Sequence, residues 1–517
     1  MATDNSQLMT ASLMKSRTAL WMVLLVSLAV RLYSVGAPLT DGGQERQTQV
    51  AMIARNLYRE NMNILYPRMD IFAPEPGYVI LEFPLQSALM AVAYHFVGDK
   101  DIVGRLITIG FSMGSIIFMY LLCRYFLPEK WALLSASIYA LTPLSIYFGR
   151  AVFPESLLMF FSLGALYFLL RWSEIFRLRY YVLSLIFAAI AFLVKAPPGL
   201  AMALPLCAIW WMRWRYSLVK RVDFYVYFGF SILPIALWIY WSTYFGSLAD
   251  GWNVYNISTI ERLGIPGIWL DRMFYIKLFI SLFIVTLTPM VFLFSAIGLV
   301  EVRNHRLCAV AYAWVLSMTV FVFITAGAQA SHWNYQVPLI PEGALLATIG
   351  IYYFTKNQRV ISVWQEIKNK RGVVLSLMGM GCLLALGYIA IYSSVIRNAY
   401  DINKRIPYAI EVGKIVRKEI PDNGFIMLIQ PGMVATCQAY YMDRKVRFLN
   451  NSSDQVPLTV AKLELWRAKG AIGVVAVDTP YGSGPELVKS RPDLLAYLRS
   501  NYRIVRESKH YLIYSLR

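Results

Sequence analysis

Charged residues, cysteine and histidine are all scarce in this chain of 517 residues. Only 15% of the residues are charged, five are cysteine and four are histidine. The cysteines are scattered and form no CxxC pair, so the sequence indicates no disulfide framework. The histidines show no metal-ligand spacing, so a structural zinc site is not indicated either. A protein stabilised by disulfides or by zinc is therefore not expected.

Hydrophobic residues, in contrast, make up 58% of the chain, and the mean hydropathy is +0.51. Repeated apolar runs of about 20 residues indicate a polytopic α-helical membrane protein surrounded by membrane lipids. The net charge is +19. Many of the basic residues occupy short loops between apolar runs, where they set the orientation of a membrane protein. A nucleic-acid partner is not expected, since it would require basic residues concentrated on one soluble surface.

The first apolar run, residues 19–35, follows Lys15 and Arg17 and predicts a signal anchor whose N-terminus stays inside. A cleaved signal peptide is the alternative, because SVGA loosely resembles a cleavage site. The further apolar runs lie near 79–97, 102–123, 131–148, 154–171, 180–194, 198–212, 223–245, 273–299, 307–326, 335–354 and 373–395.

Twelve crossings would return the chain to its starting side, but the basic loops favour eleven. Five clusters of Lys and Arg, near 124–130, 171–179, 213–221, 303–306 and 356–371, share the side of Lys15 only if one early run does not cross. The run 79–97 contains Glu82, Pro84 and His95, so we interpret it as a juxtamembrane helix at the interface. The alternative is twelve spans with a cytoplasmic tail.

The composition changes near residue 398, which divides the chain into a transmembrane domain, 1–397, and a tail domain, 398–517. The tail predicts strands at 425–430, 446–450, 472–479, 502–508 and 511–517, with helices at 402–419, 456–469 and 485–499. Strands that alternate with helices indicate a small α/β domain, with an antiparallel hairpin at its end. It carries no GxGxxG or P-loop. On the eleven-span topology this domain lies outside the cytoplasm.

The loop between the first two apolar runs, residues 36–100, is long and rich in carboxylates. Asp41 lies near its start and is followed by two glycines, which let the backbone turn back onto the membrane surface. A carboxylate placed there can take the proton of an attacking hydroxyl group. The alternative role of Asp41 is an N-cap for a helix over 42–60.

Four further positions outside this loop could take part in chemistry. Glu155 begins a span in GRAVFPESLLMFF, and an ionisable residue at the edge of an apolar core is expected to be functional. Lys195 in FLVKAPPGL predicts a phosphate contact or a side chain that snorkels to the interface. His332 and Tyr335 in SHWNYQVP are substrate contacts or interfacial anchors.

In this order the segments resemble those of the GT-C glycosyltransferases. The similarity, over about 19–355, is to the protein O-mannosyltransferase type and the lipid A aminoarabinose transferase type. It rests on DGGQERQTQVAMIARNLY, NILYPRMD, EFPL, GRAVFPESLLMFF, LVKAPPGLAMALP and HWNYQVPLIP. The resemblance implies a helical bundle with juxtamembrane helices in the first outer loop. It also implies a sugar donor carried on polyprenyl phosphate, an active site on the periplasmic face of a bacterial inner membrane, and an acceptor that is a lipid, a glycan or a protein.

The same resemblance implies roles for individual residues. Asp41 and Glu155 match the acidic residues of the first and second outer loops, and they are the expected catalytic pair. They are also the candidates for a divalent metal site, with Mg²⁺, Mn²⁺ or Zn²⁺. The expected donor-phosphate contacts are Lys195, Arg46 and Arg150, and the expected substrate contacts are Gln47, Asp70, Glu82, His332 and Tyr335.

Two positions depart from the family pattern. Phe83 stands where the aminoarabinose transferases have a lysine beside Glu-x-Pro, and Gly42 follows Asp41 where the family has a second acidic residue. Two alternatives to a glycosyltransferase remain. One is a transporter or flippase of a polyprenyl-linked glycan, although no internal repeat of the transporter kind occurs. The other is a polymerase or ligase that uses a diphosphate-linked glycan.

Overall fold

The computed structural model describes residues 18–246, 267–305, 307–368, 408–430, 436–449, 459–479 and 482–517, with isolated positions between 372 and 387. The predicted run 373–395 is therefore not described continuously. Contacts between Cα atoms divide the chain into two compact units. The first comprises 1–35, 105–241 and 255–396, and the second comprises 36–104, 242–254 and 397–517.

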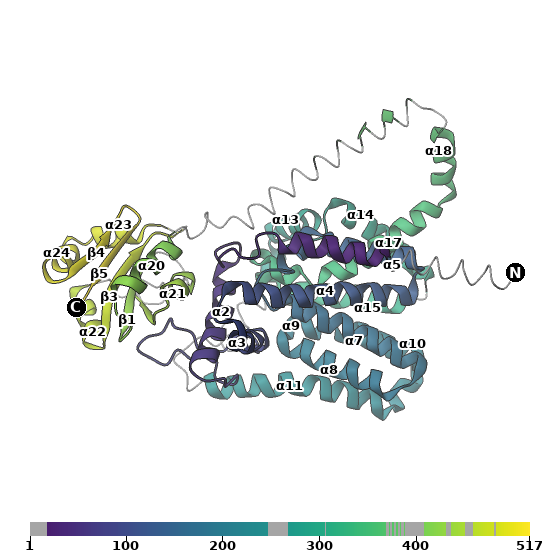
Figure 1. The fold of residues 1–517 in the computed structure, drawn as a ribbon. Coiled ribbons are helices and arrows are strands. Elements are labelled where there is room, and N and C mark those ends of the chain that lie inside the picture. The colour runs from purple at the N-terminus through teal and green to yellow at the C-terminus, as the bar shows by residue number, and fades with distance from the viewer. Residues whose placement is uncertain are drawn as a thin grey trace. The chain divides into compact units, whose positions relative to one another are not determined.

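The first unit is a set of apolar helices (Figure 1). After the helix Thr18–Leu32 come α4 (Asp101–Phe126), α5 (Glu129–Leu141), α6 (Pro143–Phe148), α7 (Glu155–Ile175), α8 (Leu178–Val194), α9 (Ala196–Leu200), α10 (Ala203–Trp214), η1 (Arg215–Lys220), α11 (Val222–Gly246), η2 (Ile268–Leu270), α13 (Arg272–Ile280), η3 (Ser281–Thr286), α14 (Pro289–Glu301), η4 (Val302–Asn304), α15 (Cys308–Ile324), α16 (Ala326–Ser331), η5 (Trp333–Gln336), α17 (Leu339–Lys356) and α18 (Gln358–Lys368).

Among the described helices, α4, α7 and α11 are each long and apolar enough to cross a membrane, and the bent pair α13–α14 adds a fourth if it is one span. The helices Thr18–Leu32, α8 and α15 are shorter and also apolar. Every predicted apolar run up to 335–354 contains a helix, so the polytopic α-helical class is confirmed. The number of eleven spans stays a prediction.

The predicted run 273–299 is not one straight helix, because α13 and α14 meet at an angle of 105°. The π-helical turn η3 ends at Thr286, and Thr288 takes a left-handed φ of 71° immediately before Pro289. Proline disfavours a helical conformation at the preceding residue, which explains why the chain bends there. Apolar composition alone carries no signal for such a break.

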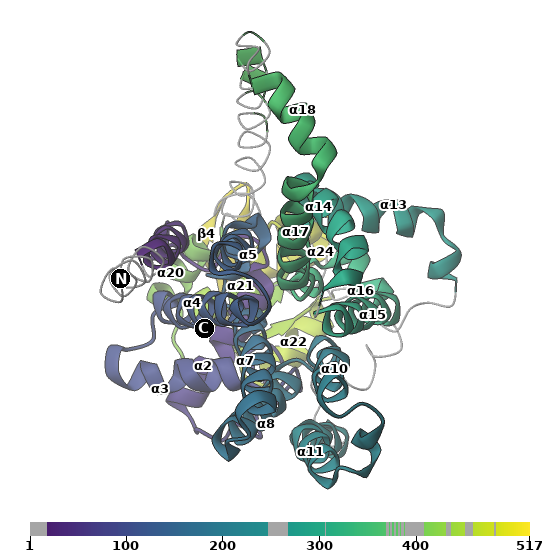
Figure 2. The ribbon, with the colours of Figure 1, turned by 90° about the vertical axis from the view of Figure 1, so that its right-hand side faces the viewer.

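Small residues let the helices of this unit approach closely. Helix α14 packs along α17, and a Cβ atom added at Gly298 or Gly350 would collide with the backbone of the other helix. Close backbone approach through glycine is typical of helix packing in membranes. Helix α7 likewise packs along α8, and α10 along α15; Figure 2 views several of these helices nearly end on.

The second unit joins the first outer loop to the tail domain. The loop contains α2 (Gln44–Arg59) and α3 (Leu85–Val97), which pack against each other. Helix α3 begins after Pro84, inside the run that we interpreted as juxtamembrane. Between α2 and α3 the backbone pairs with the tail: Val446 N–H donates to the Asp70 carbonyl oxygen (2.7 Å), and Ala73 N–H donates to the Val446 carbonyl oxygen (3.0 Å).

The tail forms a five-stranded sheet in the order β2-β1-β3-β5-β4, confirming the small α/β domain. Its strands are β1 (Phe425–Ile429), β2 (Val446–Phe448), β3 (Ala471–Val477), β4 (Arg503–Glu507) and β5 (Tyr511–Ser515). Strand β1 is parallel to β2 and β3, whereas β4 and β5 form the predicted antiparallel hairpin. All five predicted strands are present.

Helices cover both faces of this sheet. Helices α22 (Val460–Ala468), α23 (Gly484–Lys489) and α24 (Pro492–Asn501) bury Leu463, Val488 and Leu498 in one core with Met427 and Val474 of the sheet. The predicted single helix 485–499 is two helices, because Pro492 begins α24. The remaining helices are α20 (Ala409–Glu419) and α21 (Thr436–Met442), which pack together. The sequence reading missed α21.

Candidate active site

A buried ion pair joins two of the predicted site residues in the first unit. Glu155 is the first residue of α7 and Lys195 lies between α8 and α9; their side chains are 1% and 3% exposed. Lys195 Nζ donates to Glu155 Oε1 at 2.5 Å. Lys195 therefore does not snorkel to the interface, because its charge is matched inside the helical unit.

The same carboxylate receives a second hydrogen bond, from the segment that contains His332 and Tyr335. Asn334 Nδ2 donates to Glu155 Oε1 at 2.8 Å. The Lys195 ammonium lies 4.6 Å from the centre of the Tyr335 ring, within the range of a cation–π contact. The other oxygen, Glu155 Oε2, is buried and has no hydrogen-bond partner among the described residues. One carboxylate oxygen is thus held by two donors while the other is available.

Arg150 and His332 belong to the same unit. Arg150 is 1% exposed, and its Nη2 donates to the Ser34 carbonyl oxygen at 3.3 Å. His332 precedes η5 and its ring lies 6.4 Å from that of Tyr335. The Tyr335 ring in turn stacks on Phe321, which fixes its orientation beside Lys195.

A second polar cluster lies at the start of the first outer loop, in the other unit. Asp41 is 1% exposed, and Gln47 Nε2 donates to its Oδ1 at 2.5 Å and to the Gly42 carbonyl oxygen at 3.0 Å. Helix α2 begins after Gly43, whose φ of 66° is left-handed, and no side chain caps it. Asp41 is therefore not the N-cap, and that alternative is wrong. Glycine at 43 permits the turn that separates Asp41 from the helix.

Side chains of α2 bind Glu82 and Asp70 in the same unit. Arg46 forms an ion pair with Glu82, and its Nη1 donates to Gln49 Oε1 at 3.1 Å. Asp70 accepts a hydrogen bond from Asn56 Nδ2 at 3.1 Å. Burial raises the pKa of Asp70, and the Asn56 hydrogen bond only partly offsets this rise. The structure thus gives Glu82 and Asp70 partners within the loop itself.

A family model for dolichyl-phosphate-mannose-protein mannosyltransferases matches residues 82–241. The chain is also similar to ArnT from Cupriavidus metallidurans in the apo state, at 14% identity and a TM-score of 0.61, over 96% of this chain and 97% of that one. The fold is that of the GT-C glycosyltransferases. The resemblance stated from the sequence is thereby confirmed at the level of fold.

Further solved structures share this GT-C fold. ArnT bound to undecaprenyl phosphate matches at 13% identity and a TM-score of 0.57, over 96% and 97% of the two chains. The Archaeoglobus fulgidus oligosaccharyltransferase with Zn and sulfate matches at 13% and 0.56, over 88% of this chain and 67% of that one. Its complex with an inhibitory peptide and a dolichol-phosphate matches at 12% and 0.57, over 89% and 69%. A comparison with curated protein sequences finds no match.

Two polar residues of this GT-C fold were missed by sequence reasoning. Asn334 stands between the two residues singled out in SHWNYQVP, and its amide is a natural donor to a carboxylate. Arg31 lies in the first apolar helix and is fully buried. A charged residue inside a predicted span is itself a functional signal, and that signal was overlooked.

Arg31 links four segments of the helical unit. Its Nε donates to Ser112 Oγ at 2.9 Å, and its Nη2 donates to the carbonyl oxygens of Ala140 and Ser145 at 3.1 and 3.2 Å. A Cβ atom added at Gly149 would collide with the Arg31 side chain. Arg31 therefore fixes the segment that leads through Gly149 and Arg150 to Glu155.

The described residues do not fit a metal centre. No group of three His, Cys, Asp or Glu side chains gathers anywhere in the described ranges. The charge of Glu155 is matched by Lys195, whereas Mg²⁺ and Mn²⁺ favour several oxygen ligands and Zn²⁺ favours nitrogen and sulfur ligands. We therefore assign no chemical step to a metal.

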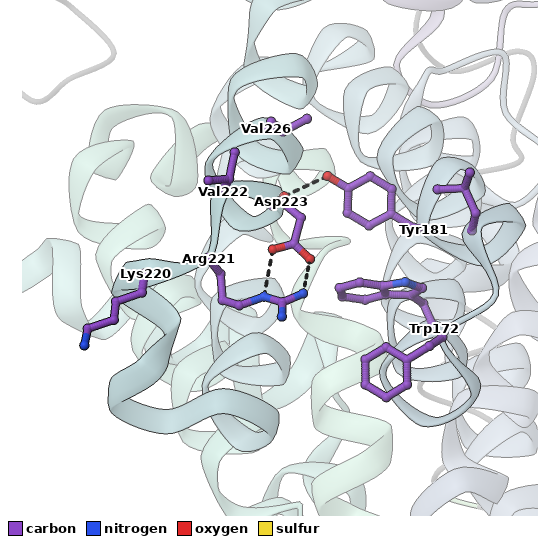
Figure 3. A pocket seen from close by; sticks show the side chains of 9 residues that line it. Trp172, Tyr181, Lys220, Arg221, Val222, Asp223 and Val226 are labelled. Carbon is purple, nitrogen blue, oxygen red and sulfur yellow. Dashed lines mark hydrogen bonds and ion pairs between the residues drawn. The ribbon is translucent and has the colours of Figure 1, made fainter.

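A cavity of about 710 Å³ opens elsewhere in the helical unit (Figure 3). Trp172 and Tyr181 line one side, and Arg221 lies on the other, where it forms a two-pronged ion pair with Asp223. Lys220 also belongs to the lining. None of the predicted site residues lines it, and its arginine is already matched, so it is not the candidate active site.

Proposed function

We propose that the chain is an integral-membrane, inverting glycosyltransferase. It moves a monosaccharide, a hexose or a pentose, from a polyprenyl-phosphate carrier to a lipid, glycan or protein acceptor outside the cytoplasm. The observation that carries this proposal is a buried carboxylate, Asp41, that a neutral amide holds and no helix uses as a cap. The undecaprenyl phosphate and dolichol-phosphate bound to structures of the same fold support the class of donor.

The proposed reaction has one bond-forming and one bond-breaking event at the anomeric carbon. The acceptor oxygen attacks this carbon, and the bond from carbon to phosphate oxygen breaks with its electron pair leaving on polyprenyl phosphate. The acceptor proton passes to Asp41, the general base. Gln47 orients the carboxylate by donating to its Oδ1.

Lys195 is the proposed contact for the donor phosphate, with Arg46 and Arg150 as further cations. An ammonium group has three N–H donors, and Glu155 Oε1 takes one of them. The remaining donors can bind phosphate oxygens while the ion pair with Glu155 persists. Glu155 therefore acts by binding Lys195. Its second oxygen, Oε2, has no hydrogen-bond partner among the described residues and can accept a hydrogen bond from the sugar.

The other predicted contacts complete the substrate side. The Tyr335 ring lies beside Lys195, and the His332 ring lies near that of Tyr335. Glu82 orients Arg46, and Asp70 supports the loop through Asn56. We do not route the reaction through a divalent metal, and transfer measured with and without EDTA tests whether one takes part.

The test of this function is a transfer assay in which the purified protein is added to host membranes. Radiolabelled undecaprenyl-monophosphate sugars should lose their sugar to the acceptor and release undecaprenyl phosphate. A polymerase or ligase would instead consume a diphosphate-linked glycan. A flippase would move the lipid across a vesicle bilayer without breaking the phosphate–sugar bond. Either of those results would overturn the proposal.

We further propose a multi-pass protein of a bacterial inner membrane, with the first outer loop and the tail domain on the periplasmic face. Single cysteines at Asp101 and Lys130, in a chain without native cysteines, test this orientation. An impermeant thiol reagent should label position 101 and spare position 130. The reverse labelling would contradict the eleven-span topology.

A further inference from the structure

The tail domain supplies side chains that hold the first outer loop, although the two are about 400 residues apart in sequence. Helix α21 packs along α2 within the second unit. Thr436 Oγ1 donates to the Glu45 carbonyl oxygen at 2.8 Å and lies 2.9 Å from Thr48 Oγ1. The first turn of α2 is thus bonded directly to the tail.

Tyr441 of α21 connects the tail to the backbone next to Asp41. The Leu39 N–H donates to Tyr441 Oη at 2.6 Å, and the Tyr441 hydroxyl donates to Asp101 Oδ2 at 2.8 Å. The neighbouring Tyr440 hydroxyl donates to the other oxygen, Asp101 Oδ1, at 2.7 Å. One phenol therefore accepts from the loop and donates to a carboxylate that two adjacent tyrosines share.

The protonation of these tyrosines suits this arrangement. Burial raises the pKa of Tyr440 and Tyr441 far above its ordinary value, and the nearby Asp101 charge raises it further. Both hydroxyl groups thus keep their protons at physiological pH. The two hydroxyl groups can therefore donate to Asp101 under working conditions.

A second tie fixes the far end of α2. Arg55 Nε donates to Asp99 Oδ2 at 2.6 Å, and Arg55 Nη1 donates to the Tyr440 carbonyl oxygen at 2.8 Å and to Asp443 Oδ1 at 3.1 Å. The Arg55 guanidinium also stacks 4.0 Å above the Tyr440 ring. Since Gln47 projects from α2, the helix that orients the Asp41 carboxylate is held at both ends by α21.

We propose that Tyr441 is a positioning residue for Asp41, which makes the tail domain part of the catalytic apparatus. This inference rests on the proposed role of Asp41 as general base. Tyr441 does not touch substrate; it fixes the backbone two residues before Asp41, as α21 fixes the helix that carries Gln47. A small displacement of a catalytic group costs much rate, because reacting atoms must lie within a narrow range of distance and angle.

The test replaces Tyr441 with Phe, which keeps the ring and removes only the hydroxyl group. We expect kcat to fall on the order of tenfold, with little change in the KM for the undecaprenyl-monophosphate sugar. Hydrogen exchange at the Leu39 amide should become faster, because its acceptor is lost. In an Asp41→Asn background the same change should cost no further activity, because the group that it positions is already inactive.

Tyr502→Phe is the matched control. Its hydroxyl donates to Glu464 within the tail domain, so it loses an equivalent bond without contact with the loop. It should keep wild-type kcat and wild-type exchange at Leu39. Asp101→Asn is the second variant, and it should reproduce the slower turnover of Tyr441→Phe.

The outcomes are distinguishable. Wild-type turnover in Tyr441→Phe beside a slow Asp41→Asn enzyme would overturn the positioning role and leave the proposed function intact. A loss that multiplies with that of Asp41→Asn would also overturn it, because the residue would then act elsewhere. Full activity of Asp41→Asn would overturn the proposed base and the role of Tyr441 together.

Discussion

The two polar clusters hold their carboxylates in opposite ways. In the helical unit Glu155 is bound to a cation, Lys195, whereas in the loop unit Asp41 is bound to a neutral amide, Gln47. A carboxylate paired with an ammonium group fixes the position of that positive charge. A carboxylate oriented by a neutral amide can accept a proton. In the proposed function, Lys195 of the helical unit is the main phosphate contact and Asp41 of the loop unit is the base, and the predictions below test that division.

The largest expected effect is on turnover in Asp41→Asn. The amide keeps the shape and the hydrogen bond of Asp41 but cannot take the proton of the acceptor. We expect a loss of at least about a hundredfold in kcat with donor binding preserved. Glu155→Gln should lose rate less and donor affinity more. If Glu155→Gln is inactive while Asp41→Asn turns over normally, the division is inverted.

The next effect concerns binding of undecaprenyl phosphate to Lys195→Ala. Loss of a charged donor should weaken affinity about tenfold or more, since hydrogen bonds to charged groups contribute about 1.5–3 kcal/mol. Equilibrium binding to protein in nanodiscs measures it. Lys220→Ala, at an exposed lysine that is none of the predicted site residues, is the control and should bind normally.

The double variant Lys195→Ala with Glu155→Gln separates binding from stability. Lys195→Ala alone leaves a buried carboxylate without its cation, which typically costs about 3–5 kcal/mol. Removing the charge of Glu155 as well should restore much of the Tm while affinity stays low. If affinity recovers together with the Tm, Lys195 is a structural partner of Glu155 and not a phosphate contact.

A smaller effect, on stability, is expected for Arg31→Met. The change removes hydrogen bonds that Arg31 donates to buried oxygens of three other segments, although the Ser145 carbonyl keeps its bond from the Gly149 N–H, so we expect a total cost of about 1–3 kcal/mol. Thermal unfolding in detergent should show a lower Tm, and Arg150 and Glu155 should become misplaced. Arg213→Met, at an exposed arginine, is the control and should keep the wild-type Tm. An unchanged Tm in Arg31→Met would show that Arg31 does not organise the helical unit.

The smallest effect is the pH dependence contributed by Asp70. Its folded-state pKa is raised by burial, so the unfolded chain ionises at lower pH and stability falls as pH rises through this window. Asp70→Asn removes that loss and should unfold at a slightly higher temperature than wild type at pH 7. The difference should shrink toward pH 4.

Much of the fold was predictable because apolar runs and strand patterns are local signals. The five strands and the hairpin of the tail follow from short β-rich runs between 425 and 517. The bend at Thr288 had a local signal in Pro289, which the reading of 273–299 as one apolar run left unused. Helix α21 is only seven residues long, too short for a periodic pattern.

The site residues were predictable as types but not as partners. Asp41, Glu155 and Lys195 stand out because charges are rare near apolar runs. That Lys195 meets Glu155, or that Tyr441 meets Leu39, depends on tertiary contacts across 40 and 402 residues of sequence. The resemblance to the GT-C glycosyltransferases supplied the roles, and the structure supplied the pairings within each unit.

The bond between Leu39 and Tyr441 also bears on biosynthesis. A membrane protein is inserted as it is synthesised, so the loop that carries Asp41 emerges hundreds of residues before its partner exists. The ribosome must add about 400 residues before α21 can bond to that loop. A chain interrupted before α21 would therefore insert its first helices yet lack the contacts that hold the proposed base in place, so activity would be acquired only after α21 has been made.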